Sequence, residues 1–411
     1  MRSLPGSVGL GQVRYPTAGN AYSEEEAQPF YVNAPFGIVL VHNGNLTNAP
    51  ALKAELVQVD RRHINTDSDT EVLINILAHE LQFAARDLPL TPVVIFKAVA
   101  AVHRRVKGSY AVVALIAGYG LLAFRDPFGI RPLCFGEGTA TDEPAGRSVM
   151  VASESVALEG TGHRMARDVA PGEAIFIDLE GRIHARQCAL APKLYPCMFE
   201  YVYLARPDTT IRGRVVHEAR VEMGRTLARE HPVAADLVIP TPESGTPAAI
   251  GYAQESGIPY GQGLVKNAYV GRPFISPNQT IRQLGIRLKL NPLREVIHGN
   301  RLVVVDDSIG RGNTQRALVR MLREAGAAEV HVRISSPPVR WPCFYGIDFA
   351  TRAELIATGI GVADVCRSIG ADSLGYISEA GMIAATNHPA APLGPSLLNI
   401  PEPPRTYPIL D

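Results

Sequence analysis

The 411-residue sequence has no excess of charge of one sign, because Lys and Arg together number 40, as do Asp and Glu. Without a long-range positive field, binding to bulk nucleic acid is not expected, whereas a small anionic ligand needs only a local site. The sequence also has no apolar run long enough to cross a bilayer, since its most apolar stretch, residues 111–124, is interrupted by Gly118 and Gly120. Residues 1–11 lack the pattern of a secretory signal. These absences predict a cytoplasmic protein.

Cysteine is scarce as well. The five cysteines are Cys134, Cys188, Cys197, Cys343 and Cys366. None of them forms a CxxC pair, and their scatter argues against both a disulfide framework and a zinc site of the usual spacing. A buried, unreactive thiol is the default expectation for each.

The composition that remains, with 46% hydrophobic and 19% charged residues, is typical of a globular protein with two or three domains. Residues 1–190 contain short apolar strands (36–41, 109–116, 120–124 and 149–152) and two helical patterns (69–81 and 93–106). Because strands and helices are clustered rather than strictly alternating, this region is expected to form a layered α+β sandwich.

Residues 191–386 follow a different rhythm. Helices are predicted at 217–230, 245–255 and 313–325, and strands at 236–239, 302–305 and 329–334. Strand, loop, helix and strand in that order form a βαβ unit, which predicts an α/β domain with a mainly parallel sheet. Residues 387–411 are dense in proline and are expected to be unstructured.

The segment with the most chemical information is 302–314, LVVVDDSIGRGNT. An apolar strand ends in Asp306 and Asp307, and a short loop leads into a helix. Such a junction directs backbone N–H groups and the positive end of the helix toward one point, where an anion can bind. Gly312 lets the backbone approach that anion closely. An acidic strand end with an ordinary helix cap is the alternative interpretation.

Two adjacent carboxylates would repel a phosphate unless something intervenes. They suit the 2- and 3-hydroxyls of a ribose, or a magnesium ion that bridges ribose and pyrophosphate. The pattern also differs from a Walker loop, which places a lysine at the end of its glycine run. The segment therefore predicts a site for a sugar phosphate.

This segment resembles the type I phosphoribosyltransferases, whose motif for phosphoribosyl pyrophosphate (PRPP) looks like VVDDSIVRGTT. The resemblance implies that Asp306 and Asp307 hold the ribose hydroxyls. It also implies that the following residues wrap the 5-phosphate: Ser308, Ile309, Gly310, Arg311, Gly312, Asn313 and Thr314. Gly310 stands where the family has a branched aliphatic residue, so the loop is expected to be looser here.

Two further segments resemble parts of the same site. Residues 240–248, PTPESGTPA, match the pyrophosphate-binding turn of that family through Glu243, Ser244 and Gly245, and imply magnesium ligation by Ser244 with Asp306 and Asp307. Residues 266–293 form a long basic stretch that is expected to be a lid. Its cations that could neutralise pyrophosphate are Lys266, Arg272, Arg282, Arg287 and Lys289. A solvated basic face or a weak RNA patch is the alternative.

The amino-terminal half contains GLGQVRYPTAG (9–19), HNGNLTN (42–48) and HINTDSDTE (63–71). These segments resemble the glutamine pocket of class II amidotransferases. The resemblance implies that Arg14 pairs with the α-carboxylate of glutamine, that Asn43 and Gly44 form an oxyanion hole, and that Asp69 accepts the α-ammonium.

The order of these motifs, followed by FRDPFGIRPL (124–133), ASESVAL (152–158) and FEYVYLARPD (199–208), is similar to the PRPP amidotransferases. The resemblance extends from about residue 7 to 376. It implies an N-terminal-nucleophile (class II glutaminase) α+β sandwich, here incomplete, followed by an α/β type I phosphoribosyltransferase domain. The implied reaction converts PRPP, glutamine and water to 5-phosphoribosylamine, glutamate and pyrophosphate in the first step of purine synthesis. Homo-oligomers and inhibition by purine nucleotides are implied too.

The sequence departs from this family in two places. The family uses a cysteine at the mature N-terminus as nucleophile, whereas this chain begins with Met1, and Cys134 is expected to be a core residue. The polypeptide is therefore expected not to hydrolyse glutamine, to use ammonia instead, and to leave a sheet edge unpaired. Cys197 and Cys343 match two ligands of a 4Fe–4S cluster found in one branch, but four thiolates normally hold it, so the cluster is expected to be absent or labile.

Two alternatives to an active transferase remain open at this point. One is a non-catalytic regulator that binds PRPP through the same loop. The other is a fragment that does not fold by itself.

Overall fold

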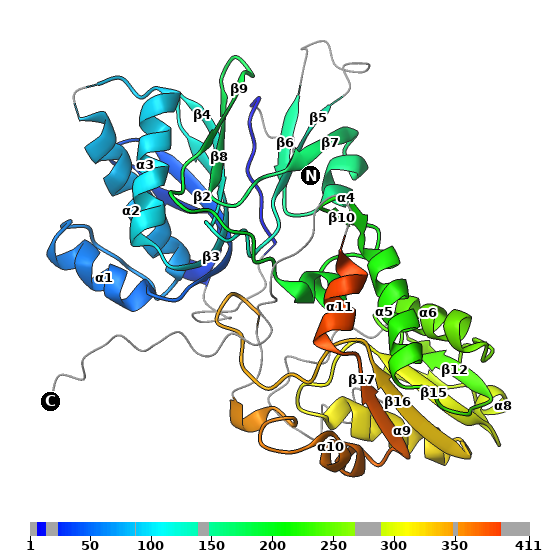
Figure 1. Cartoon of the computed structure of the whole chain (residues 1–411). Coiled ribbons are helices and arrows are strands. Elements are labelled where there is room, and N and C mark those ends of the chain that lie inside the picture. Colours follow the sequence, from blue (N-terminus) through cyan, green and yellow to red (C-terminus); the bar gives the residue numbers. More distant parts are fainter. Residues whose placement is uncertain are drawn as a thin grey trace, which may run out of the picture. The chain divides into compact units, whose positions relative to one another are not determined.

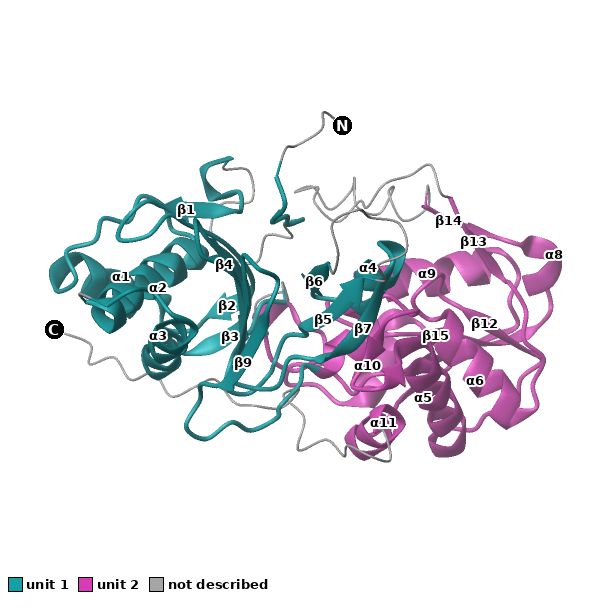
Figure 2. Cartoon of the chain, turned by 90° about the horizontal axis from the view of Figure 1, so that it is seen from above, with its two compact units in different colours: residues 1–197, 343–348 teal, residues 198–342, 349–411 magenta. Residues whose placement is uncertain are grey.

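A computed structural model of the chain describes residues 6–13, 24–86, 88–138, 148–267, 289–347 and 352–387. The chain forms two compact units, shown in Figure 2. Unit 1 comprises Met1–Cys197 and the short segment Cys343–Asp348, and unit 2 comprises Met198–Pro342 and Phe349–Asp411. The boundary after Cys197 lies close to the division expected at residue 190. The proline-rich tail lies outside the described residues from 388 onward.

Unit 1 is built on two antiparallel sheets. The larger sheet has the order β1-β2-β3-β4-β8-β9, and the smaller has the order β6-β5-β7. The strands are β1 (Phe30–Val32), β2 (Ile38–Leu46), β3 (Gly108–Ile116), β4 (Gly120–Arg125), β5 (Cys134–Gly138), β6 (Val149–Ala152), β7 (His163–Asp168), β8 (Glu173–Asp178) and β9 (Ile183–Gln187). The helices are η1 (Glu24–Glu26), α1 (Ala49–Gln58), α2 (Asp69–Ala85), α3 (Pro92–Arg105) and α4 (Ser155–Gly160).

The larger sheet of unit 1 is covered on both faces. Along β3, Tyr110, Val112 and Ala114 pack in the cluster that includes α1, α2 and α3, whereas Ala111 packs with Phe135 of the smaller sheet. Alternate residues of a strand point to opposite faces, so β3 serves two cores at once. Figure 1 shows the three helices on one side of the larger sheet and β5, β6 and β7 on the other. The predicted α+β sandwich is thereby confirmed.

Local signals explain where the two long helices of unit 1 begin. The Ser68 side chain accepts a hydrogen bond from the Thr70 N–H, and the Thr91 side chain accepts one from the Val94 N–H. Pro92 occupies the first turn of α3, where its missing N–H carries no cost. Within the described part of the chain, β1 and β9 are the outer strands of the larger sheet. β1 has three residues and pairs only with residues 38–40 of β2, so, among the described residues, positions 41–46 of β2 have no strand partner on that side.

Unit 2 is built on the parallel sheet β12-β15-β16-β17. Its strands are β10 (Thr210–Ile211), β11 (Arg214–Val215), β12 (Leu237–Pro240), β13 (Leu264–Lys266), β14 (Leu290–Pro292), β15 (Arg301–Asp306), β16 (Glu329–Ile334) and β17 (Ser373–Tyr376). Its helices are the π-helix η2 (Glu200–Leu204), α5 (Val216–Glu230), α6 (Thr246–Ser256), α8 (Arg294–Ile297), α9 (Asn313–Glu324), η4 (Arg352–Glu354), α10 (Val362–Ile369) and α11 (Glu379–Thr386).

Both faces of the parallel sheet are buried. In β15, Val303 and Val305 pack in one cluster with α5, α6 and α11, and Leu302 and Val304 pack in another with α9 and α10. Figure 1 shows these helices on the two sides of the sheet. A strand that is buried on both faces has apolar residues at consecutive positions, which explains the run LVVV at residues 302–305. The predicted α/β unit is confirmed.

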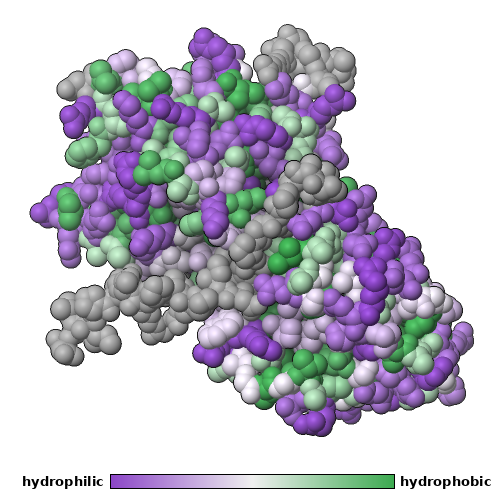
Figure 3. All heavy atoms as spheres, in the orientation of Figure 1, coloured by the Kyte–Doolittle hydropathy of each residue, from purple (hydrophilic) through white to green (hydrophobic). Residues whose placement is uncertain are grey.

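Among the described residues, no helix is both long enough and apolar enough to cross a membrane. On the face shown in Figure 3, apolar residues form small groups among polar ones.

Candidate active site

The two loops predicted to bind PRPP leave the sheet at the same edge. β12 and β15 are parallel neighbours with Pro240 opposite Val305, so the turn 241–245 and the phosphate loop, residues 308–314, both follow carboxyl ends of strands. The turn lies against β15, since the Thr241 N–H donates to the Val305 carbonyl at 2.8 Å. A Cβ atom on Gly245 would lie 2.4 Å from that same oxygen, so glycine is required there.

The phosphate loop presents a continuous run of backbone donors. Within the described part of the chain, the N–H groups of residues 308–315 have no hydrogen-bond acceptor, and the first helical bond of α9 is Arg316 N–H to the Gly312 carbonyl at 3.0 Å. Gly312 precedes α9 with φ of 76°, a conformation that favours glycine. Unsatisfied amides next to a helix N-terminus are able to bind an anion. Binding of a phosphate by these residues stays a prediction.

Asp306 and Asp307 lie beside this run and are almost completely buried. The Asp307 N–H donates to Asp306 Oδ1 at 2.9 Å, the Gln315 side-chain amide donates to Asp306 Oδ2, and Ser308 Oγ donates to Asp307 Oδ1 at 2.5 Å. Burial raises the pKa of Asp306 well above its usual value, and the neighbouring Asp307 charge raises it further. Burial also raises the pKa of Asp307. The hydrogen bond to the Ser244 side chain and the Arg220 charge act in the opposite direction and lower it.

These acids have the chemistry of a partial magnesium site. Magnesium prefers oxygen ligands and is usually held by one or two carboxylates together with water and substrate phosphates. Two buried carboxylates of raised pKa and the Ser244 hydroxyl beside them fit such a site, because a divalent cation would remove the penalty of burying their charge. Within the described residues no group of three or more His, Cys, Asp or Glu side chains could hold a metal by itself.

The structure describes the base of the predicted lid. β13 and β14 pair with Lys266 opposite Leu290, and the Asn267 N–H donates to the Lys289 carbonyl at 2.8 Å. Lys266 Nζ lies 3.2 Å from Glu243 Oε2, so one predicted lid cation does lie beside the pyrophosphate turn. Arg272, Arg282 and Arg287 lie outside the described residues, at 268–288.

In unit 1, Asn43 and Gly44 occupy consecutive positions of β2. Arg131 donates to Asn43 Oδ1 from both Nε and Nη2, at 3.2 Å each. Gly44 has φ of 148°, and a Cβ atom there would lie 2.1 Å from the Ser109 carbonyl oxygen, so no other residue fits without moving the backbone.

Arg131 is held in place by the segment that precedes it. The Arg125 guanidinium donates to the carbonyls of Gly129, Arg131 and Val169, at 2.6–2.9 Å. Asp126, fully buried, accepts from the N–H groups of Phe128 and Ile130. The sequence motif 124–133 marks this segment, but the position of Arg131 beside Asn43 is not readable from it.

Asp69, expected to accept the α-ammonium of glutamine, begins α2 and has 8% of its surface exposed. Its Oδ2 accepts from the Leu46 N–H at 3.0 Å, and its Oδ1 lies 3.9 Å from His42 Nδ1. The carboxylate thus lies at the end of β2 that carries Asn43. Arg14 lies outside the described residues.

A segment from much later in the chain packs at this end of β2. Asn45 Nδ2 donates to the Phe344 carbonyl at 2.8 Å, and Ser109 Oγ donates to the Tyr345 carbonyl at 2.7 Å. A Cβ atom on Gly346 would lie 2.9 Å from the Gly44 backbone. The sequence signals neither contact, because the partners are 299 and 236 residues apart.

The cysteines do not offer the ligand set of an iron–sulfur cluster in the described part of the chain. Cys197 is buried and Cys343 half-buried, and no group of three metal-binding side chains includes either of them there. Four thiolates are normally needed. Cys134, expected to be a core residue, is buried in β5, and burial raises its pKa to about 12.

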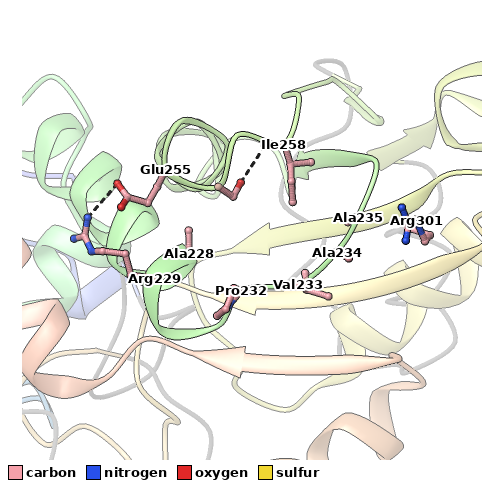
Figure 4. Close-up of a pocket in the computed structure, with 10 residues that line it drawn as sticks. Ala228, Arg229, Pro232, Val233, Ala234, Ala235, Glu255, Ile258 and Arg301 are labelled. Carbon is pink, nitrogen blue, oxygen red and sulfur yellow. Dashed lines mark hydrogen bonds and ion pairs between the residues drawn. The ribbon is translucent and has the colours of Figure 1, made fainter.

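A separate cavity of about 490 Å³ lies at the opposite end of the parallel sheet, where β12 and β15 begin (Figure 4). Its cations are already paired: Arg229 lies 3.1 Å from Glu255, and Arg301 lies 2.7 Å from Asp236.

The fold and these sites define a two-part protein: a class II glutaminase sandwich and a type I phosphoribosyltransferase sheet. A family model described as a glutamine amidotransferase domain matches residues 19–160. The chain is 53% identical over 409 residues to the amidophosphoribosyltransferase of Mycobacterium tuberculosis, covering 96% of this chain and 73% of that relative. It is 50% identical over 379 residues to that of Escherichia coli, covering 91% and 74%.

A solved structure is also similar: glutamine PRPP amidotransferase from B. subtilis, complexed with ADP and GMP. It has a TM-score of 0.78 and 41% identity, with 91% of this chain and 77% of that chain covered. The chain belongs to the amidophosphoribosyltransferase family, the enzymes of the first step of purine synthesis.

Proposed function

We propose that this chain binds PRPP at the carboxyl edge of the β12–β15 sheet and transfers ammonia to C1 of its ribose, which gives 5-phosphoribosylamine and pyrophosphate. The observation that carries the proposal is the run of acceptor-free N–H groups at 308–315 beside two buried carboxylates. A dianionic phosphate satisfies the amides, and the ribose hydroxyls satisfy the acids.

In this proposal Asp306 and Asp307 accept hydrogen bonds from the 2- and 3-hydroxyls. Residues 308–314 hold the 5-phosphate, and Glu243, Ser244 and Gly245 face the pyrophosphate. Ser244, Asp306 and Asp307 would hold magnesium, which when bound neutralises charge on the leaving pyrophosphate.

The chemical step exchanges one bond for another at C1. The C1–O bond to pyrophosphate breaks, the C1–N bond to ammonia forms, and the new ammonium loses a proton. The cations Lys266, Arg272, Arg287 and Lys289 would stabilise the departing pyrophosphate. Closure of the lid over the site would keep water from hydrolysing PRPP.

In the glutaminase half, Arg14 would hold the α-carboxylate of glutamine, Asp69 its α-ammonium, and Asn43 and Gly44 the developing oxyanion. Purine nucleotides are proposed as inhibitors, and the B. subtilis relative was solved with ADP and GMP. Homo-oligomers are proposed as the assembled form.

Calorimetric titration of the 411-residue chain with PRPP and magnesium tests binding, and phosphoribosylamine formation with ammonium chloride tests transfer. Binding together with ammonia-dependent product supports the proposal. Binding without product would favour a PRPP-binding regulator. A chain that shows no cooperative unfolding transition and no binding would be a fragment, and the proposed function would be wrong.

A further inference from the structure

The phosphate loop touches a segment that follows it by some forty residues, the brace segment, residues 352–358. The Ile356 N–H donates to the Gly310 carbonyl at 3.0 Å. The Ile356 side chain lies under Gly312, since a Cβ atom on Gly312 would be 2.6 Å from Ile356 Cδ1. Arg311 Nη2 lies 3.2 Å from Glu354 Oε1. Three consecutive loop residues therefore have a partner in the brace segment.

The brace segment is itself anchored in unit 2. Leu355 and Ala357 are buried, each with 3% of its surface exposed. The Arg352 guanidinium stacks 3.9 Å from the centre of the Trp341 ring, and Thr358 Oγ1 donates to the Arg340 carbonyl at 3.2 Å. These contacts fix the backbone of the brace segment, and so fix the position of Ile356 against the loop.

The bond to Gly310 fixes the direction of the next amide. In a trans peptide the C=O and the N–H point in opposite directions. With the Gly310 carbonyl directed at Ile356, the Arg311 N–H, which is one of the acceptor-free donors of the loop, points away from the brace segment. If this peptide turned over, a carbonyl oxygen would replace a donor at the anion site and repel phosphate. Glycine at 310 makes such a turn easier than a branched residue would.

We propose that Ile356 is a positioning residue for the 5-phosphate: it holds the Gly310–Arg311 peptide with its N–H toward the ligand and supports Gly312 from below. The inference rests on the proposed function, because it assigns residues 308–314 to the 5-phosphate. Glu354 contributes less, since its ion pair with Arg311 is about half exposed and such pairs are weak.

The test separates the two ends of the substrate. Ribose 5-phosphate and magnesium pyrophosphate are titrated separately into the wild-type chain and into Ile356→Ala, with folding checked by circular dichroism. Ile356→Ala keeps the backbone N–H that bonds Gly310 but removes the side chain that packs against Gly312. Without that side chain the loop is held less firmly, and we expect ribose 5-phosphate to bind about tenfold more weakly, a loss as large as that of one hydrogen bond to a charged group. Pyrophosphate affinity should stay at the wild-type value. Ile360→Ala, which alters an exposed isoleucine four residues further on, is the matched control and should change neither.

A rescue experiment distinguishes positioning from general stability. Adding Gly310→Ile to Ile356→Ala should recover ribose 5-phosphate affinity, because the branched side chain restrains the same peptide and a Cβ atom at 310 meets no atom within 4 Å. Val365→Ala, in the core of the same unit, should lower the melting temperature without altering either affinity.

Wild-type affinity for ribose 5-phosphate in Ile356→Ala, or equal losses for both ligands, would overturn the inference. If Ile356→Ala does not fold, Ile356→Val takes its place with a smaller selective loss expected, and the same two outcomes would overturn it. Failure of the wild-type chain to bind either ligand would instead overturn the proposed function.

Discussion

Arg131 donates two hydrogen bonds, each 3.2 Å long, to the side-chain oxygen of Asn43. The arginine is 8% exposed, so this pair is shielded from water. Because the amide oxygen is engaged, the free edge of the Asn43 side chain offers only its NH₂ group. A donor aimed away from a fixed acceptor is what an oxyanion hole needs, since it is oriented before the charge develops.

Removing Arg131 should therefore impair glutamine hydrolysis without impairing glutamine binding. In a polypeptide that carries a cysteine-led segment ahead of these residues, we expect Arg131→Ala to lower kcat for glutamine by about 10- to 100-fold with KM nearly unchanged, because the oxyanion interaction exists only in the transition state. Steady-state assay of glutamate release measures this. Arg104→Ala, on the exposed face of α3, is the control. A change confined to KM would contradict the positioning role of Arg131.

Replacing either buried acid should separate binding from stability. We expect Asp306→Asn and Asp307→Asn each to weaken PRPP binding by about 10- to 100-fold, through loss of a charged hydrogen bond of roughly 1.5–3 kcal/mol. The melting temperature of the ligand-free chain should hold or rise, because a desolvated charge is removed. Calorimetry gives the affinity and thermal unfolding the stability. Asp364→Asn, on the surface of α10, should alter neither. Unchanged affinity in both acid variants would remove the ribose assignment.

Two buried groups of unit 1 should give opposite pH dependences of stability. Burial raises the pKa of Asp126 to about 6. The stabilisation that protonated Asp126 adds to the folded state is therefore complete at low pH and is lost as pH rises from about 4 to 6. Burial lowers the pKa of His103 to about 4, so its contribution is complete above pH 6.5 and is lost as pH falls toward 4. Each amounts to about 3 kcal/mol at most, and in the wild-type chain they largely cancel.

Replacing one of the two groups should reveal how the other changes the free energy of unfolding with pH. Relative to the wild type, His103→Gln should lose free energy of unfolding as pH rises from 4 to 6, and Asp126→Asn should gain it. Urea titrations at several pH values between 4 and 7 measure the difference. The same sign of slope in both variants would show that these two groups do not govern the acid stability of unit 1.

Two glycines of the phosphate loop should respond differently to a side chain. Gly310→Ile should be tolerated and should stabilise the chain by roughly 0.4–1 kcal/mol, by restricting the unfolded state. Gly312→Ala should destabilise the chain and weaken ribose 5-phosphate binding, because φ is 76° and the methyl group would strike Ile356. Thermal unfolding and calorimetry measure both. Equal effects at the two positions would mean that the loop differs from the described conformation.

Local pattern predicted most of the fold. The apolar run before Asp306 and the amphipathic helix after Gly312 are adjacent in sequence, so strand, loop and helix could be read directly. The Ser68 and Thr91 caps likewise mark the starts of α2 and α3. Short strands with weak alternation, such as β7 and β9, were missed, because their residues are largely exposed and carry little apolar signal.

The supports of the site could not be predicted in the same way. Arg131 meets Asn43 across 88 residues, and Ile356 meets Gly310 across a stretch of chain about half as long. Such contacts arise from how strands and loops converge in three dimensions, and they leave no periodic trace. A family motif shows that residues 124–133 matter, but which side chain touches Asn43 depends on the turn that Arg125 and Asp126 build.

The small segment Cys343–Asp348 bears on how this protein could be taken apart. A gene fragment cut after Cys197 would encode all the strands of unit 1 that the structure describes, yet leave Asn45 and Ser109 without the carbonyls of Phe344 and Tyr345. Anyone who dissects the chain, or grafts its glutaminase onto another transferase, would have to splice those few residues back. Part of unit 1 is thus encoded inside the coding sequence of unit 2, so a single crossover cannot exchange one unit for another.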